Sequence, residues 1–430
     1  MYLKSFFICF LHFCGAKLHI FREKTLSLHP KYNEMKYLLT MICLLAMFTS
    51  CSSDHEDDGD GPQVLPVSSR TVLVYMSAEN NLSINADDNL GQMAKGAASL
   101  GANYHLIAFV DQNNSDMPYM AEISQGKITK VKEFASDINA ADPREMRDII
   151  KWTANNYPAD DYGLVLWGHA SGWLIKDSVA TRSDGPKRAF GIDNGYGKWM
   201  NTPSMARYIA ESGVKFHYIF ADACCFQCVE NAYELRNVTD LLIGAPSEIP
   251  GDGAPYDAII PHLFNGKDDF YKGVIEEYEK RYESQGCSVP LSVIKTSEMD
   301  NLALAAHDVW AAMPQPWPSA DKVIYYFKDN SKKICYDALD IVRTNTTETI
   351  TDKWQTALNK AVIYSNYNIK YEWMTSGFVN FNDFTLDLNR MACVSMFVPL
   401  ETYGTGKNSH NELISRMAWH KASGMADVWK

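Results

Sequence analysis

The chain has 430 residues, of which 46% are hydrophobic, and this is enough to bury a large core. Charged residues make up an ordinary 21%, and the formal net charge of −12 argues against nucleic acid as a partner. The ten cysteines do not form the dense, regular framework of a small disulfide-bonded domain. This composition fits a soluble extracytoplasmic domain or a protein with a site for cationic ligands.

Residues 35–51 have the pattern of a lipoprotein signal peptide. A lysine after Met35 is followed by an apolar run and by small residues that end at Cys51. We therefore expect lipid attachment at Cys51, although Phe48 stands where such signals usually carry Leu. A plain secretory signal or an uncleaved anchor is the alternative. Residues 1–34 make little sense as mature protein, so we interpret them as an upstream extension before a true start at Met35.

Residues 52–69 predict a flexible tether, because they are acidic, contain Gly, Pro and Ser, and have almost no large apolar side chains. The acidic run after Cys51 resembles the start of surface-displayed lipoproteins of Gram-negative anaerobes. This resemblance implies an extracytoplasmic protein that its lipid holds at the outer membrane or cell surface, or one that is secreted.

Two continuous apolar runs, 71–76 and 105–110, are typical of strands that are covered on both faces. The segment between them predicts a helix over 89–100. Residues 119–134 alternate between apolar and polar side chains and contain Gln125-Gly126, which indicates a β-hairpin.

The next helix and strand lead to the first candidate catalytic residue. Asp142 followed by Pro143 predicts a helix start, with the carboxylate as cap and proline in the first turn. The apolar run 163–167 then predicts a strand that ends just before His169. A long polar segment, 174–202, follows, and a loop of that length inside a compact domain is usually functional or cleavable.

Two further runs, 216–221 and 241–245, continue the alternation of strands and helices. Such alternation predicts parallel connections and a three-layer α/β/α sandwich with a mainly parallel sheet. We place this domain at 70–315. Residues 316–430 predict a mostly helical C-terminal subdomain with a late strand at 394–398.

Two of the predicted strands end in residues that suit nucleophilic catalysis. His169 follows one strand and Cys224 follows the other. A thiol attacks as its thiolate, so a catalytic Cys needs a partner that takes its proton, and His exchanges protons near neutral pH. The backbone N–H groups of Cys224 and Ala170 could stabilise the developing oxyanion. Because reactive residues gather at the carboxyl ends of strands in open α/β sheets, we expect one site that contains both side chains.

Three segments indicate which class of cysteine enzyme this is: Trp167–Trp173, Asp222–Cys224 and Glu230–Leu235. Together they resemble the clostripain-like cysteine peptidases, which belong to the caspase, gingipain and legumain group. The resemblance spans about residues 70–430, and it includes Glu79–Leu82 and Pro246–Tyr256. It implies a caspase-like fold, in which His169 matches the catalytic histidine and Cys224 the nucleophile.

The resemblance also implies a substrate preference. Asp222 and Asp252 match the acidic residues of the family's S1 pocket, and two carboxylates in one pocket would select Arg or Lys at P1. It further implies cleavage after a basic residue in the 174–202 loop, for which we favour Arg182. The other basic residues of the loop are Lys176, Lys187, Arg188 and Lys198.

We expect protein or peptide substrates and a monomeric chain. The sequence requires no cofactor and indicates no metal site, since it contains no EF-hand loop. Relatives can depend on Ca²⁺, so a calcium requirement is an expectation that the resemblance alone carries.

The chain departs from the family at two positions. Ala170 stands where the family has Gly, which would strain the oxyanion donor if that residue takes a positive φ and would be nearly silent otherwise. Cys225 stands where an apolar residue is more usual.

Other interpretations stay open. A surface-binding protein that has lost catalysis is the main alternative, with Ala170 as the sign of decay. A thiol oxidoreductase that uses Cys225 and Cys228 is a weaker one, and no second Cys or His pair supports zinc there. Asp222 and Asp252 could also be ordinary turn or cap carboxylates.

Overall fold

The computed structural model describes residues 68–112, 117–175, 190–329, 332–375, 377–406 and 408–429. They belong to one compact unit that begins at Val64. The predicted upstream extension 1–34, the signal peptide 35–51 with Cys51, and almost all of the tether 52–69 lie outside the described residues. The first strand begins at Ser68, close to the predicted start of the folded part.

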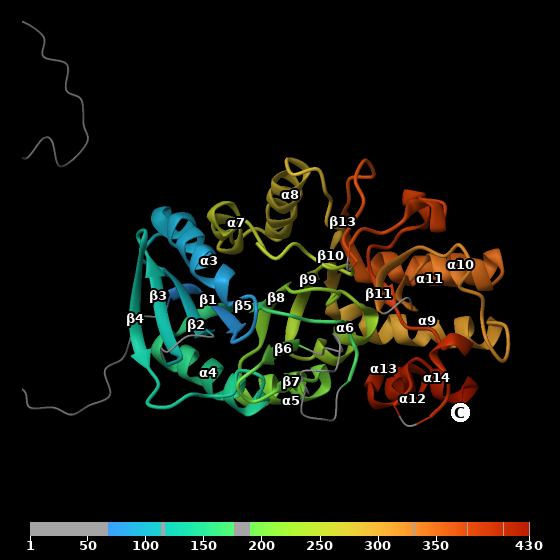
Figure 1. The fold of residues 1–430 in the computed structure, drawn as a ribbon, viewed down its shortest axis with the longest axis horizontal. Helices are drawn as coiled ribbons and strands as arrows, with labels where there is room; N and C mark the ends of the chain where they lie inside the picture. Colours follow the sequence, from blue (N-terminus) through green and yellow to red (C-terminus); the bar gives the residue numbers. More distant parts are fainter. Residues whose placement is uncertain are drawn as a thin grey trace, which may run out of the picture. The chain divides into compact units, whose positions relative to one another are not determined.

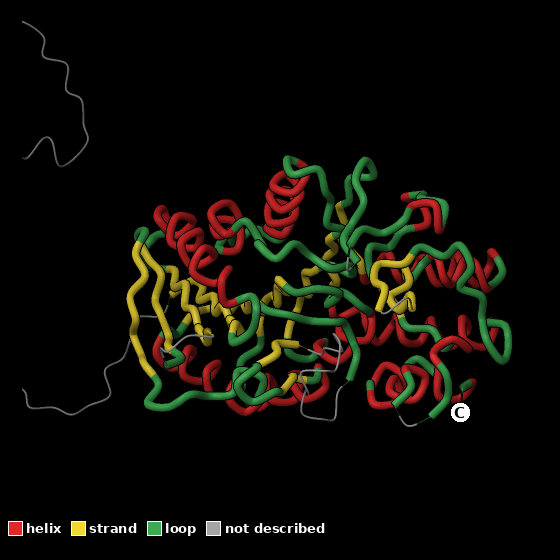
Figure 2. The backbone as a smooth tube through the Cα atoms, viewed as in Figure 1, coloured by secondary structure: helices red, strands yellow, loops and turns green. Residues whose placement is uncertain are grey.

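A nine-stranded sheet is the centre of the structure (Figures 1 and 2). Its strand order is β13-β10-β9-β8-β5-β1-β2-β3-β4. The five central strands are parallel, whereas two antiparallel strands are added at each edge. The strands are β1 (Ser68–Ala78), β2 (Tyr104–Gln112), β3 (Tyr119–Ser124), β4 (Lys127–Glu133), β5 (Ala159–Trp167), β8 (Phe216–Asp222), β9 (Thr239–Gly244), β10 (Leu291–Lys295) and β13 (Val362–Asn366).

Helices cover both faces of this sheet, as Figure 1 shows. One face packs on α3 (Ser83–Gly96), α7 (Tyr256–Leu263) and α8 (Phe270–Glu283). The other face packs on α4 (Pro143–Asn156), α5 (Thr202–Ser212), α6 (Val229–Leu235), α9 (Met299–Ala312) and α11 (Glu348–Ala361). Successive residues of β1 enter different cores, since Val72 and Val74 belong to one and Leu73 and Tyr75 to the other. The caspase-like three-layer α/β/α prediction is therefore confirmed.

Several local signals in the sequence have the expected structural result. Asp142 caps α4 by accepting a hydrogen bond from the N–H of Arg144, with Pro143 in the first turn. Gln125 and Gly126 both take positive φ in the turn between β3 and β4, as a tight hairpin requires. The first helix differs from its prediction over 89–100: α3 begins at Ser83, and a short 3₁₀ turn, η1 (Ala97–Ser99), follows it.

The C-terminal part adds a strand to the main sheet and forms a second, three-stranded sheet. The main sheet continues past residue 315, because β13 pairs antiparallel with β10. A second sheet is formed by β11 (Tyr325–Asp329), β12 (Lys332–Asp337) and β14 (Ser395–Met396), so the late strand is shorter than 394–398. The remaining α-helices are α10 (Asp340–Asn345), α12 (His410–Leu413), α13 (Ala418–Ala422) and α14 (Met425–Val428), and the 3₁₀ turns are η2 (Thr296–Glu298), η3 (Phe381–Asp383), η4 (Leu388–Arg390), η5 (Glu401–Tyr403) and η6 (Ile414–Arg416).

The predicted 174–202 loop contains regular structure at its carboxyl end. β6 (Phe190–Asp193) and β7 (Lys198–Met200) form an antiparallel hairpin, and α5 begins at Thr202. The prediction that residues 174–202 form a loop throughout is therefore wrong. Residues 176–189, which include Arg182, lie outside the described residues. Among the helices of the described ranges, none combines the length and apolar character needed to cross a membrane.

Candidate active site

The two candidate catalytic residues occupy equivalent positions on neighbouring parallel strands. Trp167 on β5 faces Asp222 on β8 in register. His169 and Cys224 each follow this pair by two residues. The N–H of Gly168 donates to the carbonyl of Asp222 at 3.4 Å, which extends the pairing beyond the strands. The sheet thus brings both residues to one edge, as the sequence predicted.

A cavity of about 320 Å³ lies at this edge, and both His169 and Cys224 line it. Cys224 is half-buried, whereas Cys225 and Cys228 are fully buried. The other lining residues come from the turn after β1, the end of β8, the segment after β9 and the C-terminal part. They are Asn81, Leu82, Trp167, Gly168, Asp222, Glu248, Ile249, Pro250, Gly251, Gly253 and Met374.

The imidazole of His169 is oriented by the turn after β1. Its Nε2 lies 2.7 Å from Oδ1 of Asn81. When Nε2 carries the proton it donates to this amide oxygen, so Nδ1 is then the basic nitrogen. Asn80 holds the turn in place: its amide donates to the carbonyls of Ser77 and Ile192, and its Oδ1 accepts from the N–H of Leu82.

The thiol of Cys224 has a backbone donor beside it. The N–H of Ile249 lies 3.5 Å from Sγ of Cys224, and the carbonyl of the same residue lies 4.0 Å from it. A donor aimed at sulfur favours the thiolate over the thiol. The segment that carries this donor is fixed to the turn that contains Cys224, because the N–H of Cys225 donates to the carbonyl of Ser247 at 2.7 Å.

The two departures from the family differ in their backbone geometry. Ala170 is absent from the non-glycine residues of the described ranges that take a positive φ. Its methyl group therefore adds no left-handed strain next to His169. Cys225, in contrast, has φ of 56°, so the unusual backbone lies immediately after Cys224.

Cys225 and Cys228 are poor candidates for thiol chemistry. Both side chains are fully buried. Burial raises the pKa of the Cys225 thiol well above its ordinary value, with a further contribution from Cys335. Burial also raises the pKa of Cys228, and Glu230 adds to this effect. These pKa shifts disfavour the thiolate that redox exchange requires.

Asp222 lines the cavity but is almost completely buried. Its Oδ2 accepts hydrogen bonds from the N–H of Ala254 at 3.0 Å and the hydroxyl of Tyr256 at 2.8 Å. Burial raises the pKa of Asp222 to about 6, and these hydrogen bonds oppose the rise. Gly253 makes this arrangement possible, because a Cβ there would lie 2.7 Å from Oδ2 of Asp222.

Asp252 is placed differently. Its side chain is exposed and lines a second cavity of about 290 Å³, which shares Gly253 with the first. Asn85 donates to its carboxylate at 3.4 Å, and Asn89 donates to its backbone carbonyl at 3.0 Å. Of the two predicted S1 carboxylates, only Asp222 lines the cavity of His169 and Cys224.

Among the cavity-lining residues to which the sequence analysis gave no individual role are Asn81, Glu248 and Met374. Glu248 adds a second, half-buried carboxylate to the cavity and forms an isolated β-bridge with Met374. The C-terminal part therefore supplies some of the cavity wall. Asn81 lies in the Glu79–Leu82 segment, which is part of the family resemblance. That resemblance was the sequence signal that could have identified Asn81 as a site residue.

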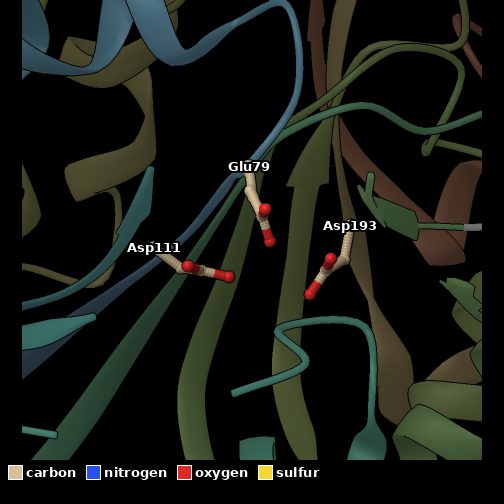
Figure 3. Close-up of side chains that lie close together, drawn as sticks. All are labelled: Glu79, Asp111 and Asp193. Atoms are coloured by element: carbon tan, nitrogen blue, oxygen red, sulfur yellow. The ribbon is translucent and has the colours of Figure 1, made fainter. Parts of the chain in front are cut away.

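The described residues contain a further group that could hold a cation, namely Glu79, Asp111 and Asp193. These residues do not line the cavity of His169 and Cys224. They lie at the ends of β1, β2 and β6 and are drawn in Figure 3.

Comparisons with known proteins agree with this geometry. The model of the Clostripain family matches residues 74–416. A relative described as clostripain, from Hathewaya histolytica, is 24% identical over 240 residues, which cover 48% of this chain and 45% of that protein. The chain thus spans about half the length of this curated relative.

Two solved structures resemble the chain over 84% of its length. One is a secreted C11 cysteine protease from Bacteroides thetaiotaomicron in complex with an irreversible peptide inhibitor, with 26% identity, a TM-score of 0.70 and 100% of its chain covered. The other is an inactive zymogen C11 protease from Parabacteroides distasonis, with 26% identity, a TM-score of 0.69 and 99% of its chain covered.

Proposed function

The chain belongs to the clostripain family, and we propose that it is a cysteine endopeptidase that cleaves after Arg or Lys with Cys224 as nucleophile and His169 as base. One observation carries the proposal: two residues beyond a registered strand pair, a His and a Cys line one cavity together with a buried carboxylate. Proteins or peptides with a basic P1 residue are the proposed substrates.

In the acylation step, Nδ1 of His169 takes the thiol proton while Sγ of Cys224 attacks the scissile carbonyl carbon. The resulting oxyanion accepts hydrogen bonds from the backbone N–H groups of Cys224 and Ala170. The imidazolium then gives its proton to the leaving amine, and the C–N bond breaks to leave a thioester. In deacylation His169 takes a proton from water, the hydroxide attacks the thioester, and the thiolate leaves. The ordinary φ of Ala170 supports its role and weighs against the decayed binding protein.

The P1 side chain is proposed to point toward Asp222. A guanidinium or ammonium group that loses water in the cavity needs a charge-assisted partner. Asp222 can accept from the substrate in addition to its three bonds from Ala254, Tyr256 and Tyr278, since a carboxylate has about four lone-pair sites. Asp252 lines the neighbouring cavity that shares Gly253, and we propose that it attracts the charged end of the P1 side chain from a greater distance.

Activation is proposed to require cleavage in the 174–202 loop, with Arg182 as the favoured site. This loop joins the strand that precedes His169 to the strand that precedes Cys224. The similar protein from P. distasonis is described as an inactive zymogen, which supports a processing step. We further propose an extracytoplasmic monomer anchored through a lipid on Cys51, in line with the similar B. thetaiotaomicron protease described as secreted.

Peptide cleavage by the reduced protein tests these assignments. Fluorogenic peptides with Arg, Lys, Asp or Leu at P1 are compared for the wild type, Cys224→Ala, Cys225→Ala and, as a control in a distant buried site, Cys287→Ala. Turnover of Arg and Lys peptides that only Cys224→Ala abolishes supports the proposal. Loss only in Cys225→Ala would move the nucleophile by one residue. No turnover of any peptide, even after the loop is cut, would leave the non-catalytic binding protein as the better explanation.

A further inference from the structure

A row of three paired residues runs from the wall of the catalytic cavity onto the surface of the C-terminal part. Glu248 and Met374 form one isolated antiparallel β-bridge, and Met374 and Phe378 form another. Residues that lie directly opposite each other in an antiparallel pair point their side chains to the same face. Because Glu248 and Met374 both line the cavity of His169 and Cys224, the side chain of Phe378 extends the same wall outward.

The outer end of this row is apolar and open to solvent. Phe378 is 59% exposed, and Met374 is half-buried. Phe378 also lines another cavity, of about 400 Å³, together with Tyr371, Phe381 and Ile369, of which Ile369 is 51% exposed. Single exposed apolar side chains are common on proteins, whereas apolar side chains grouped around a hollow mark binding sites. We call Met374, Phe378 and Ile369 the apolar surface.

The backbone that carries Met374 and Phe378 is anchored by the residue beside Met374. Trp373 is fully buried and stacks on Phe384, with ring centroids 5.8 Å apart. The N–H of Val379, which follows Phe378, donates to the carbonyl of Trp373 at 2.9 Å. The apolar surface is therefore formed before any ligand binds, and this lowers the entropic cost of binding.

The order of the strands decides which part of a substrate meets this surface. β8 lies between β5 and β9 in the sheet. His169 follows β5 and Glu248 follows β9, so they lie on opposite sides of Cys224. In the proposed reaction His169 gives its proton to the leaving amine, so the leaving part of the substrate lies on the β5 side. The acyl part, with P1 and the residues before it, then lies on the β9 side, toward Glu248 and Met374.

We propose that Met374, Phe378 and Ile369 form a subsite for an apolar side chain of the substrate at P2, P3 or P4, an inference that rests on the proposed function. Neighbouring strands lie about 4.8 Å apart and an extended chain covers about 3.3 Å per residue, so the row from Glu248 to Phe378 has the length of about three residues. The residues before P1 therefore reach the apolar surface. The preferred substrates are peptides in which an apolar residue such as Leu stands shortly before the basic P1 residue.

Cleavage of a positional peptide set tests the subsite. The reduced full-length protein, with its 174–202 loop cut, is assayed with Ala-Ala-Ala-Arg on a fluorogenic leaving group and with versions that have Leu at P2, P3 or P4. We expect Leu at one of these positions to raise kcat/KM about tenfold over Ala, because Leu buries more apolar area. Asp at the same position should lower kcat/KM below that of the Ala peptide, since its charge would lose water.

Two exposed positions provide the variant and its matched control. Phe378→Ala should reduce the ratio of kcat/KM between the Leu and Ala peptides to about threefold or less, and Met374→Ala should act in the same direction. Leu388→Ala removes another apolar side chain, 52% exposed, that lines neither cavity, and it should keep the full ratio. Because the ratio compares two peptides on one protein, a general loss of folding or activity does not change it.

Peptide binding gives a readout that needs no turnover. The full-length Cys224→Ala protein is titrated with fluorescein-labelled Leu and Ala peptides, and Kd is measured by fluorescence anisotropy. We expect the Leu peptide to bind about tenfold more tightly, and Phe378→Ala in this background to remove most of the difference. If the wild type cleaves no peptide but this difference in Kd is present, the apolar surface stands while the proposed function fails.

Other outcomes would overturn the proposal. Cleavage of Arg peptides with equal kcat/KM for Leu and Ala would leave the proposed function without this subsite. A Leu preference that survives both Phe378→Ala and Met374→Ala would place the subsite elsewhere. A preference only for Leu after the scissile bond, measured with internally quenched peptides, would reverse the direction. A dimer that Phe378→Ala dissociates in sedimentation equilibrium would assign the surface to a second copy of the chain. Absence of both cleavage and a difference in Kd would overturn the subsite and the proposed function together.

Discussion

Nε2 of His169 lies 2.7 Å from Oδ1 of Asn81, a residue 88 positions earlier in the chain. The bond joins the turn after β1 to the end of β5, two strands that are neighbours in the sheet. It selects the tautomer that leaves Nδ1 basic, and it fixes the plane of the ring. Asn81 is therefore a positioning residue for the proposed base.

We expect Asn81→Ala to lower kcat about 10- to 100-fold, the usual scale for loss of a partner that orients a functional histidine. KM should change little, because Asn81 acts through His169. Asn81→Asp should recover part of kcat, since a carboxylate also accepts from Nε2, and should shift the pH profile toward higher pH. Asn301→Ala, at an exposed position of α9, is the control. A change in KM alone would assign Asn81 to substrate binding.

Asp222→Asn should lower kcat/KM for Arg and Lys peptides about 100-fold, the cost of an unpaired buried cation. An amide can still accept from Ala254 and Tyr256 through its oxygen, so the fold should persist. Peptides with Leu at P1 serve as the internal control and should be cleaved at least as well as by the wild type. An equal loss on all peptides would instead indicate a structural role.

The pH dependence of basic-substrate cleavage should follow Asp222. Burial raises its pKa to about 6, so the carboxyl is increasingly protonated as the pH falls below 6 and cannot neutralise the P1 cation. kcat/KM for Arg peptides should fall about tenfold per pH unit below this value. In Asp222→Asn this acidic limb should disappear. A limb that persists unchanged would belong to another group, such as His169.

Asp252→Asn should have a smaller effect than Asp222→Asn, about threefold to tenfold on kcat/KM for Arg peptides, because solvent screens an exposed carboxylate. The loss should be greater at low ionic strength, and kinetics at two salt concentrations would show this. Asp257→Asn, at another exposed acid on α7, provides the comparison. A loss as large as that of Asp222→Asn would place Asp252 in direct contact with the P1 cation.

Arg182→Ala should prevent activation by cleavage of the 174–202 loop. Mass spectrometry of the wild type should show two fragments, the first ending at Arg182, whereas the variant should remain intact. Lys187→Ala in the same loop is the matched control and should be processed normally. If Cys224→Ala is also cut when it is purified alone, another protease performs the cleavage.

Much of the site was predictable because its residues follow uninterrupted apolar strands. The runs before His169 and Cys224 are unambiguous, and strand alternation places their ends at one edge of a sheet. Family resemblance then assigned roles that spacing alone leaves open. The same reasoning gave the α4 cap and the β3–β4 hairpin, since both depend on residues adjacent in the chain.

The remaining features depend on contacts between distant segments. β13 has an alternating, half-buried pattern and becomes part of the main sheet only because β10 offers it an edge. Met374 reaches the cavity through its β-bridge to Glu248, 126 positions away in the chain. Glu79, Asp111 and Asp193 are each separated by dozens of residues, so no local spacing marks them as a group. Residues of this kind can be recognised as neighbours only from the tertiary structure.

The adjacency of β5 and β8 has a consequence for the mature enzyme. If the chain is cut between them, His169 and Cys224 belong to different polypeptides, and the sheet becomes an interface between two subunits. The active enzyme would then consist of two chains that come from one monomeric precursor. Its recovery from denaturant should slow on dilution, because two chains must meet, whereas the uncut chain should refold at a rate independent of concentration.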